Sequence, residues 1–296
     1  MKSAVCFLGL SLIIASCANN TSPSQALNLE CEPYENADQV LQFAPDHLII
    51  FGEMHGTVES VEGFQQFVCS TLERGFPVRL GLETGHAQSV ALDSALATPF
   101  DDTRVRDAAP QFWSTPDGKG TEAALKFLEQ VSAWRAAGFD VSVFTYDSEP
   151  ADFRGAKDIA RVRDATMARE IDRQLEDFNG AVLVLTGGFH ARTKQFEFAG
   201  QQFFPMASEI TGRPVLSLSM KYGPGEAWVN ATVQNEDGSI ESSIGPLKVS
   251  GNVGDDTSLR VFDLEVQAEE LYDGYYFTGP ITPSPPAFPE LLEDAE

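Results

Sequence analysis

The segment "HLIIFGEMHGTVES", residues 47–60, decides the fold, because an apolar run stops there at a cluster of ionisable side chains. Residues 47–52 are apolar and bounded by turn signals, which is typical of a buried parallel strand. Glu53, His55 and Glu59 follow at once. The next stretch, 61–75, has apolar residues at helical spacing and ends at Gly75. This strand–helix unit predicts an α/β sheet with polar groups gathered at one edge.

The same alternation continues along the chain. Apolar runs predict further strands at 78–83, 140–146, 181–186 and 214–220, and amphipathic stretches predict helices at 89–97, 121–138 and 158–178. This order indicates βαβ units, and therefore a doubly wound, mostly parallel sheet with helices on both faces.

The pattern loosens after Tyr222, and the remaining chain predicts an irregular C-terminal extension. The segments 226–233 and 259–266 are predicted to be edge or antiparallel strands. We expect a single α/β domain over 39–280, followed by a proline-rich acidic tail over 281–296 that is irregular and lies on the surface or loose.

Composition limits the partners. The chain has 296 residues, 43% of them apolar, which is enough for a large core, and its net charge is −24. Such an acidic surface repels phosphate backbones, so nucleic acid is not expected as a partner.

The first residues predict export. Lys2 precedes an apolar run, 4–15, that is too short to span a membrane as a stable helix. "IASC" (14–17) resembles a bacterial lipobox. The resemblance implies a signal peptide over 1–16, a lipidated Cys17 and a flexible tether over 17–38, so that the exported protein contacts the envelope membrane only through its lipid. An ordinary cleaved signal peptide is the alternative.

Export also makes a disulfide between Cys31 and Cys69 possible, whereas the alternative for Cys69 is a buried thiol on its helix.

Ionisable residues follow each predicted strand. In an open parallel sheet, ligands bind outside the carboxyl ends of the strands. Glu83 and His86 follow the second strand, Asp147 the third and His190 the fourth. His55 and His190 both lie in the pattern Gly-x-x-His after an apolar strand. These groups are therefore expected to meet in one pocket.

Each of these residues also has a structural interpretation. Glu59 is equally consistent with a first-turn acid of the next helix, and His86 with a helix cap. Asp147 is ambiguous between a site role and ordinary solvation. His47 precedes its strand at the opposite edge, so a structural role is expected there.

The motifs resemble one superfamily. "GEMHGTVE" (52–59), "LGLE" (80–83), "RDATMA" (163–168) and "GGFH" (187–190) resemble the group that holds the erythromycin esterases, the Tiki and TraB proteins, and the ChaN-like haem-binding lipoproteins. The resemblance covers about 47–192. It implies a doubly wound α/β fold with a site at the strand ends, formed by Glu53, His55, Glu59, Glu83, Arg163 and His190.

The chain departs from these relatives in two ways. The first motif is one residue shorter than the esterase pattern between glutamate and histidine. The haem-binding members use tyrosine near the iron, and Tyr146 and Tyr222 lie near predicted strand ends without matching a motif.

Two functions follow from these residues. A hydrolase of an ester, lactone or amide would use His55 or His190 as general base on water, Glu53 or Glu83 to orient it, and Arg163 to stabilise the oxyanion. In a metal-dependent variant, His55, His190 and Glu53 would bind a divalent ion. No G-x-S-x-G motif is present, which disfavours a serine nucleophile. The segment 112–124 is a candidate lid.

The second function is haem capture at the envelope. The pocket edge would hold haem on iron ligands from His or Tyr, flanked by Phe51, Phe112, Trp113 and Phe189. Core packing is the alternative for these aromatics. A third hypothesis is a binding scaffold without activity. In each case the expected ligand or substrate is a small molecule.

Overall fold

The computed structural model describes residues 32, 34–97, 99–198, 200–234, 240–253, 260–261 and 271–293. The predicted signal peptide over 1–16, the lipidated Cys17 and Cys31 lie outside these residues. None of the helices in the described ranges has the length and apolarity needed to cross a bilayer.

The five strands predicted from the apolar runs are five consecutive strands of one sheet. Among the described residues, seven strands pair in the order β10-β11-β7-β1-β4-β2-β3, and every pairing is parallel except that of β10 with β11. Their bounds are β1 Leu48–Glu53, β2 Val78–Gly85, β3 Val141–Asp147, β4 Ala181–Gly187, β7 Val215–Lys221, β10 Arg260–Val261 and β11 Gly274–Phe277. The predicted parallel α/β fold is confirmed.

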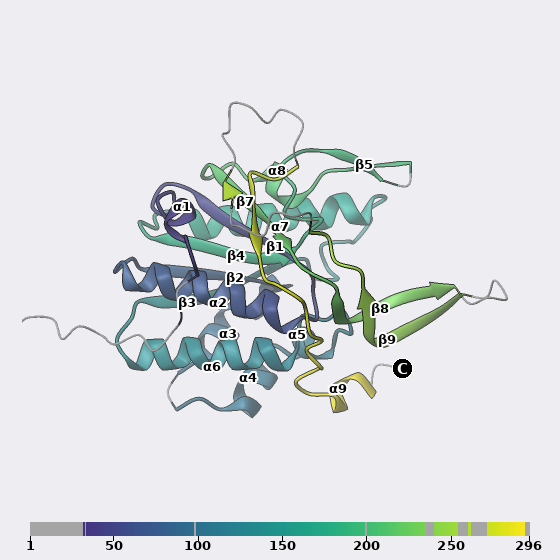
Figure 1. Ribbon diagram of the computed structural model, residues 1–296, viewed down its shortest axis with the longest axis horizontal. Helices are drawn as coiled ribbons and strands as arrows, with labels where there is room; N and C mark the ends of the chain where they lie inside the picture. The colour runs from purple at the N-terminus through teal and green to yellow at the C-terminus, as the bar shows by residue number, and fades with distance from the viewer. Residues whose placement is uncertain are drawn as a thin grey trace, which may run out of the picture.

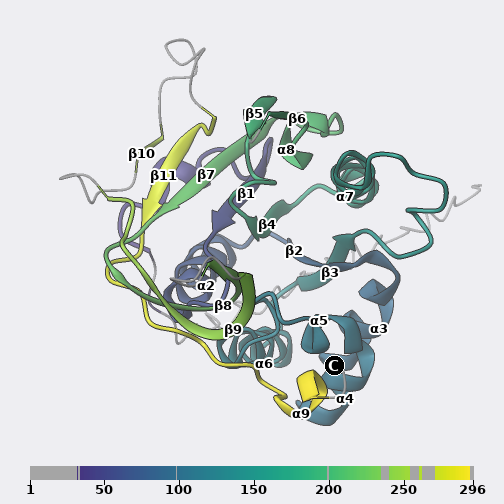
Figure 2. The same ribbon diagram turned by 90° about the vertical axis from the view of Figure 1, so that its right-hand side faces the viewer.

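Helices cover both faces of this sheet (Figures 1 and 2). Alternate residues of β1 point to opposite faces: Ile49 and Phe51 pack in the core under α2 and α6, whereas Leu48 and Ile50 pack under α7. Both faces of β1 are buried, which explains its uninterrupted apolar sequence. The helices are α1 Asp38–Leu41, α2 Val58–Glu73, η1 His86–Gln88, α3 Ser89–Ala95, α4 Asp102–Ala108, α5 Pro110–Ser114, α6 Glu122–Ala136, α7 Ile159–Leu175, α8 Met206–Glu209 and α9 Glu290–Glu293.

Two hairpins are added at the carboxyl edge of the sheet. β5 (Phe196–Phe198) pairs with β6 (Gln201–Phe203), and β8 (Gly225–Gln234) pairs with β9 (Ile240–Val249), both antiparallel. The segment 226–233 is therefore antiparallel as predicted, but it forms a separate hairpin that projects from the body (Figure 1). Of the segment 259–266, only Arg260 and Val261 are described, and they form the edge strand β10.

The chain after β11 runs over the site edge and packs against it. Pro283 forms a bridge with Thr57, and Pro286 forms one with Thr121. Ser284 is buried, and its backbone N–H donates to the carbonyl of Gly56 at 2.9 Å. The C-terminal segment therefore joins the turn after β1 to the start of α6 (Figure 2).

The N-terminal end of the described chain is packed as well. The hydroxyl of Tyr34 donates to the carbonyl of Phe277 at 2.6 Å, and its ring stacks on Phe67. The last residues of the predicted tether, 17–38, thus contact the body.

Cys69, which is buried on α2, is disulfide-bonded, and its partner lies outside the described residues.

Candidate functional site

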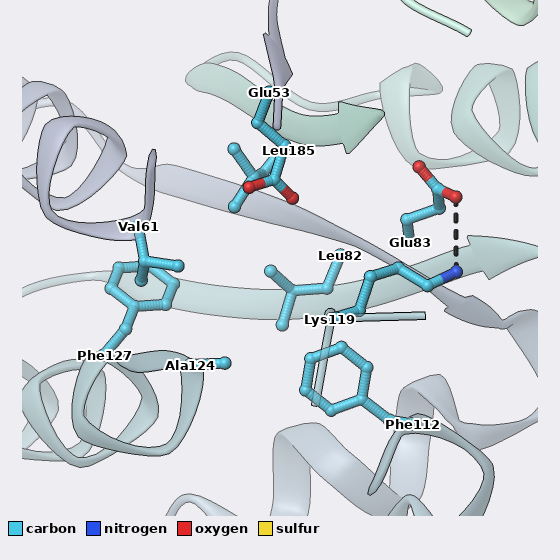
Figure 3. A pocket seen from close by; sticks show the side chains of 10 residues that line it. Glu53, Val61, Leu82, Glu83, Phe112, Lys119, Ala124, Phe127 and Leu185 are labelled. Carbon is cyan, nitrogen blue, oxygen red and sulfur yellow. Dashed lines mark hydrogen bonds and ion pairs between the residues drawn. The ribbon is translucent and has the colours of Figure 1, made fainter. Parts of the chain in front are cut away.

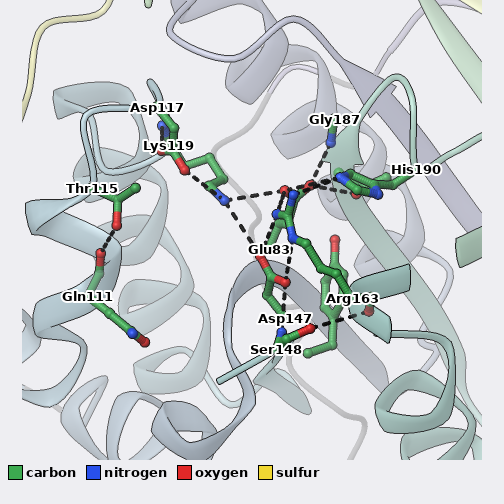
Figure 4. Close-up of polar contacts among 12 residues, drawn as sticks. Glu83, Gln111, Thr115, Asp117, Lys119, Asp147, Ser148, Arg163, Gly187 and His190 are labelled. Atoms are coloured by element: carbon green, nitrogen blue, oxygen red, sulfur yellow. Dashed lines mark hydrogen bonds and ion pairs between the residues drawn. The ribbon is translucent and has the colours of Figure 1, made fainter. Parts of the chain in front are cut away.

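The strand ends bring the predicted residues to one place. Glu53 ends β1, Glu83 lies near the end of β2, and Asp147 ends β3. His190 lies in the turn after β4, and Arg163 reaches in from the first half of α7. The turn after β4 is tied to β1 because the N–H of Gly188 donates to the carbonyl of Glu53 at 3.1 Å. Parallel neighbours therefore bring residues from distant parts of the chain into one cluster. Figure 4 shows Glu83, Asp147, Arg163 and His190 together there.

Glu83 is the centre of this cluster. Its side chain is only 3% exposed. Its Oε2 accepts hydrogen bonds from the hydroxyl of Thr186 at 2.6 Å and from the N–H of Gly187 at 2.7 Å. Its Oε1 accepts from Nη2 of Arg163 at 2.8 Å and from Nζ of Lys119 at 3.3 Å. Both oxygens are thus satisfied, as a buried carboxylate requires.

Two imidazoles flank Glu83, and each is held by another carboxylate. Nδ1 of His55 lies 2.9 Å from Oε1 of Glu53, and Nδ1 of His190 lies 2.7 Å from Oδ1 of Asp164. The two Nε2 atoms lie 3.8 and 4.0 Å from Oε1 of Glu83. The carboxylates accept from Nδ1–H, so each Nε2 is left with a lone pair when the ring is neutral.

Arg163 links the second imidazole to the two central carboxylates. Its Nε and Nη2 donate to the two oxygens of Asp147 at 2.9 and 2.6 Å, which is a bidentate pair. Nη1 lies 3.2 Å from Nε2 of His190, so the neutral ring accepts a hydrogen bond there. Four of the five N–H groups of the guanidinium are used in this way, and the second N–H on Nη1 has no acceptor among the described residues.

Lys119 brings a second cation from the loop between α5 and α6. Its Nζ lies 2.9 Å from Oδ2 of Asp117, 3.3 Å from Oε1 of Glu83 and 3.8 Å from Oδ2 of Asp147. The side chain is 11% exposed, so it is enclosed among these carboxylates (Figure 4).

The charges of the cluster shift the pKa values of its members. Burial alone would raise the pKa of Glu83, but Lys119, His190, His55 and Arg163 together hold it well below its usual range. Burial opposes the charged form of His55, yet the neighbouring Glu53 and Glu83 raise its pKa above the ordinary value of 6.5. Burial likewise opposes the charge of Lys119, and Glu83, Asp117 and Asp147 outweigh it and raise its pKa. Glu83 and Lys119 are therefore both charged at neutral pH.

Glu59 and His86, which the sequence also suggested for the site, lie outside the cluster. Glu59 accepts from the hydroxyl and the N–H of Thr282 at 2.6 and 2.8 Å, so it holds the C-terminal segment rather than an imidazole. Nε2 of His86 lies 3.1 Å from Oδ2 of Asp152, in the loop after β3.

The aromatic residues considered for haem are mostly core residues. The hydroxyl of Tyr146 is buried and donates to the carbonyl of Leu185 at 2.7 Å, and Tyr222 is also buried. Phe51, Phe112 and Trp113 lie in the core, whereas Phe189 is 47% exposed.

A small cavity lies behind the central carboxylates. It measures about 30 Å³, and its polar lining residues are Glu53, Glu83 and Lys119. Figure 3 shows the apolar side chains that also line it, which are those of Val61, Leu82, Phe112, Ala124, Phe127 and Leu185. A space of this size holds a water molecule but not a macrocycle.

A larger groove of about 650 Å³ lies at the same edge, between the start of α7 and β6. Ile159, Phe203 and Phe204 give it apolar walls, and Asp164 lies at its inner end. Its size is that of a small-molecule site.

The cluster does not suit a metal ion. A divalent ion between the two Nε2 atoms would need Oε1 of Glu83, which the cations of Arg163 and Lys119 already occupy. Within the described ranges, no group of three or more His, Cys, Asp or Glu side chains is arranged to hold a metal.

Sequence reasoning did not identify Lys119, Asp117, Asp164, Thr186 or Gly187 as site residues. Asp164 follows Arg163 in "RDATMA", Thr186 directly precedes the second Gly-x-x-His motif, and Gly187 is the first residue of that motif, so proximity to the motifs was the available signal. Lys119 lies in the segment 112–124, which was considered only as a lid.

Comparisons with known proteins bear on the fold. No protein-family model and no curated protein matches the chain. A solved structure of a Bacillus cereus protein matches with a TM-score of 0.52 at 11% identity, over 87% of this chain and 95% of that one. This similarity shows the shared fold.

The matched structures also include members of the superfamily that the motifs resemble. ChaN of Campylobacter jejuni, solved with cofacial haem, matches with a TM-score of 0.46 at 11% identity, over 64% of this chain and 87% of that one. A mutant of the erythromycin esterase EreC in its open conformation matches with a TM-score of 0.48 at 12% identity, over 68% and 76%.

Proposed function

We propose that the protein is an exported hydrolase that cleaves an ester, a lactone or an amide with water activated by His55. One observation carries this proposal: two carboxylate–imidazole pairs, Glu53–His55 and Asp164–His190, converge on a single buried carboxylate beside a guanidinium. General acid–base chemistry needs oriented imidazoles with tuned proton affinity.

His55 is the better base of the two. Glu53 holds its Nδ1–H, and its Nε2 lies 3.8 Å from the nearest carboxylate oxygen, so the lone pair is available to a water molecule. The side chain is 21% exposed, which gives a substrate access. Its raised pKa makes it a stronger base than a free imidazole.

His190 has a different role, because its Nε2 accepts from Arg163. Asp164 fixes the ring through Nδ1, and the ring in turn orients the guanidinium. The remaining N–H on Nη1 of Arg163 is then the donor for a developing oxyanion.

The reaction follows from these positions. His55 Nε2 takes a proton from water while the water oxygen bonds to the carbonyl carbon of the substrate. The negative charge that develops on the carbonyl oxygen is stabilised by Arg163. When the tetrahedral intermediate collapses, the imidazolium returns its proton to the departing oxygen or nitrogen.

The test is a panel of esters, lactones and amides assayed with the wild-type protein, His55→Ala and His86→Ala. His86 is the matched control, because its pair with Asp152 lies outside the cluster. Loss of a general base costs about 10²–10⁴-fold in rate. We expect such a loss in kcat/KM for His55→Ala and wild-type activity for His86→Ala. Equal activity in both variants contradicts the proposal.

Export and lipid anchoring are part of the proposal. The lipobox-like "IASC" supports lipidation of Cys17, and the disulfide at Cys69 supports an oxidising compartment. Labelling of cells with a fatty-acid analogue should mark the wild-type protein and not Cys17→Ser; labelling of both, or of neither, contradicts the anchor.

Haem binding is the second candidate, and one observation favours it. Phe189 is exposed, and the carbonyl of the preceding Gly188 accepts from the hydroxyl of Tyr272 at 2.8 Å; this hydroxyl also accepts from Nε of Arg192 at 3.2 Å. Tyr272 thus contacts the second histidine motif directly, whereas the hydroxyl of Tyr146 donates to Leu185 before it. Titration of haemin into the wild type and Tyr272→Phe tests this. A saturable Soret shift lost in the variant supports haem capture, and non-saturating binding unchanged in the variant excludes it.

A protein that neither hydrolyses the panel nor binds haemin would be a binding scaffold, the third hypothesis.

A further inference from the structure

Lys119 is the only lysine that the described residues place at the cluster, and the hydrolytic mechanism leaves it without a role. Burying an ammonium group is costly unless carboxylates surround it. Three carboxylates do so here, and one of them is Glu83, the carboxylate that lies 3.8 Å from Nε2 of His55.

The loop that carries Lys119 is tied to the turn that carries His55. The N–H of Gly56, the residue after His55, donates to the carbonyl of Gly118, the residue before Lys119, at 2.8 Å. Gly118 has a φ of +84°, and a Cβ atom there would lie 2.5 Å from the carbonyl oxygen of Trp228. Only glycine fits this close approach of three backbone segments, so the placement of Lys119 relative to His55 is specified by the backbone.

We propose that Lys119 is a positioning residue of the hydrolytic site, which with Arg163 clamps Oε1 of Glu83 and so holds this carboxylate at a distance from His55. This inference rests on the proposed hydrolysis. Lys119 acts through Glu83: the ammonium keeps Oε1 engaged, and Nε2 of His55 stays available to water instead of closing on Glu83 as an ion pair.

The charges in the cluster show what the loss of Lys119 would do. Two fixed cations, Lys119 and Arg163, face five carboxylates in the cluster; these are Glu53, Glu83, Asp117, Asp147 and Asp164. Removal of Lys119 adds one uncompensated negative charge beside His55. The protonated imidazole is then favoured to a higher pH, and the base is lost near neutrality.

The kinetic experiment compares Lys119→Met with Lys126→Met, which makes the same change at an exposed position on α6. We expect Lys119→Met to lose at least tenfold in kcat with little change in KM, and to shift the rising limb of kcat/KM to higher pH. Lys119→Arg, or ethylamine added to Lys119→Ala, should move the limb back. Lys126→Met should match the wild type. A wild-type pH profile in Lys119→Met contradicts the inference.

A second measurement does not depend on activity. NMR titration of the imidazoles follows His55 in the wild type and in Lys119→Met, with His86 as an internal control. The inference predicts that the pKa of His55 is higher in Lys119→Met than in the wild type, and that the substitution does not affect His86. An unchanged pKa of His55 overturns the inference. If Lys119→Met does not fold, Lys119→Ala measured with and without ethylamine decides by the same shift. Absence of hydrolysis in the wild type with a shifted His55 would refute the proposed function and leave the clamp on Glu83 standing.

Discussion

Replacement of Glu83 with glutamine removes the charge at the centre of the site while keeping the shape of the side chain. The carboxylate accepts from four donors, two on each oxygen: Thr186 and Gly187 on Oε2, and Arg163 and Lys119 on Oε1. Glutamine offers one acceptor oxygen and an NH₂ group, which is a donor only. In either orientation, two of the four donors face the NH₂ group.

The expected cost follows from this mismatch. The best arrangement keeps the amide oxygen toward Arg163 and Lys119, and the hydroxyl of Thr186 rotates to accept from the NH₂ group. The N–H of Gly187 is then buried without an acceptor, which costs about 1–3 kcal/mol, and the two cations lose one charged partner. Lys119 keeps Asp117 and Arg163 keeps Asp147, so full unpairing does not occur. We expect a loss of about 3 kcal/mol in the free energy of unfolding at pH 7.

Urea denaturation of the wild type, Glu83→Gln and the exposed control Glu129→Gln measures this difference. The folded-state pKa of Glu83 lies well below the ordinary value of 4.5, so its contribution is fully present above that value and is lost as the pH falls through the folded pKa. The gap between wild type and Glu83→Gln should therefore shrink as the pH falls below 4.5. Glu129→Gln should stay within about 0.5 kcal/mol. A gap under about 1 kcal/mol at pH 7, or one that does not change with pH, refutes the reasoning.

Three further experiments test separate parts of the structure. Arg163→Lys loses the bidentate pair with Asp147 and the oxyanion donor, so kcat should fall about 10²-fold; retention of wild-type kcat in a steady-state assay contradicts that role. Gly118→Ala should lower thermal stability more than Gly155→Ala, because both glycines have positive φ but only Gly118 meets a neighbour, the carbonyl of Trp228; equal melting temperatures count against it. Peptide mapping without reductant should detect a disulfide between Cys69 and Cys31, and a different partner for Cys69 would contradict this pairing.

The central sheet was predictable because its strands are buried on both faces. β1 and β4 appear as unbroken apolar runs at 47–52 and 181–186, and the structure places them side by side in parallel register. β11, with the sequence Gly-Tyr-Tyr-Phe, was missed because a strand of four residues is too short to show a periodicity of its own. Its pairing with β7 is decided by tertiary packing.

The site was predictable where a residue directly follows a strand. Glu53, His55, Glu83 and His190 were placed by that rule, and the structure brings them together. Lys119 does not follow a strand, and it reaches the cluster through a loop held by Gly56 and Trp228, contacts that no local pattern encodes.

Glu59 was predicted to belong to the site, but the structure places it elsewhere. The motif grouped it with the site, whereas its contacts are with Thr282, more than 200 residues later in the chain. Its alternative interpretation, a first-turn acid of α2, describes its position on that helix.

The most direct test of the account is the pH dependence of kcat/KM for ester hydrolysis, measured on wild type and on His55→Ala. The account predicts that wild-type kcat/KM rises with pH through a single ionisation above 6.5, the ordinary pKa of histidine, because Glu53 and Glu83 raise the pKa of His55. His55→Ala should lose that rising limb and about 10²–10⁴-fold of the rate. An unchanged limb in His55→Ala, with activity retained, would contradict the claim that His55 is the base.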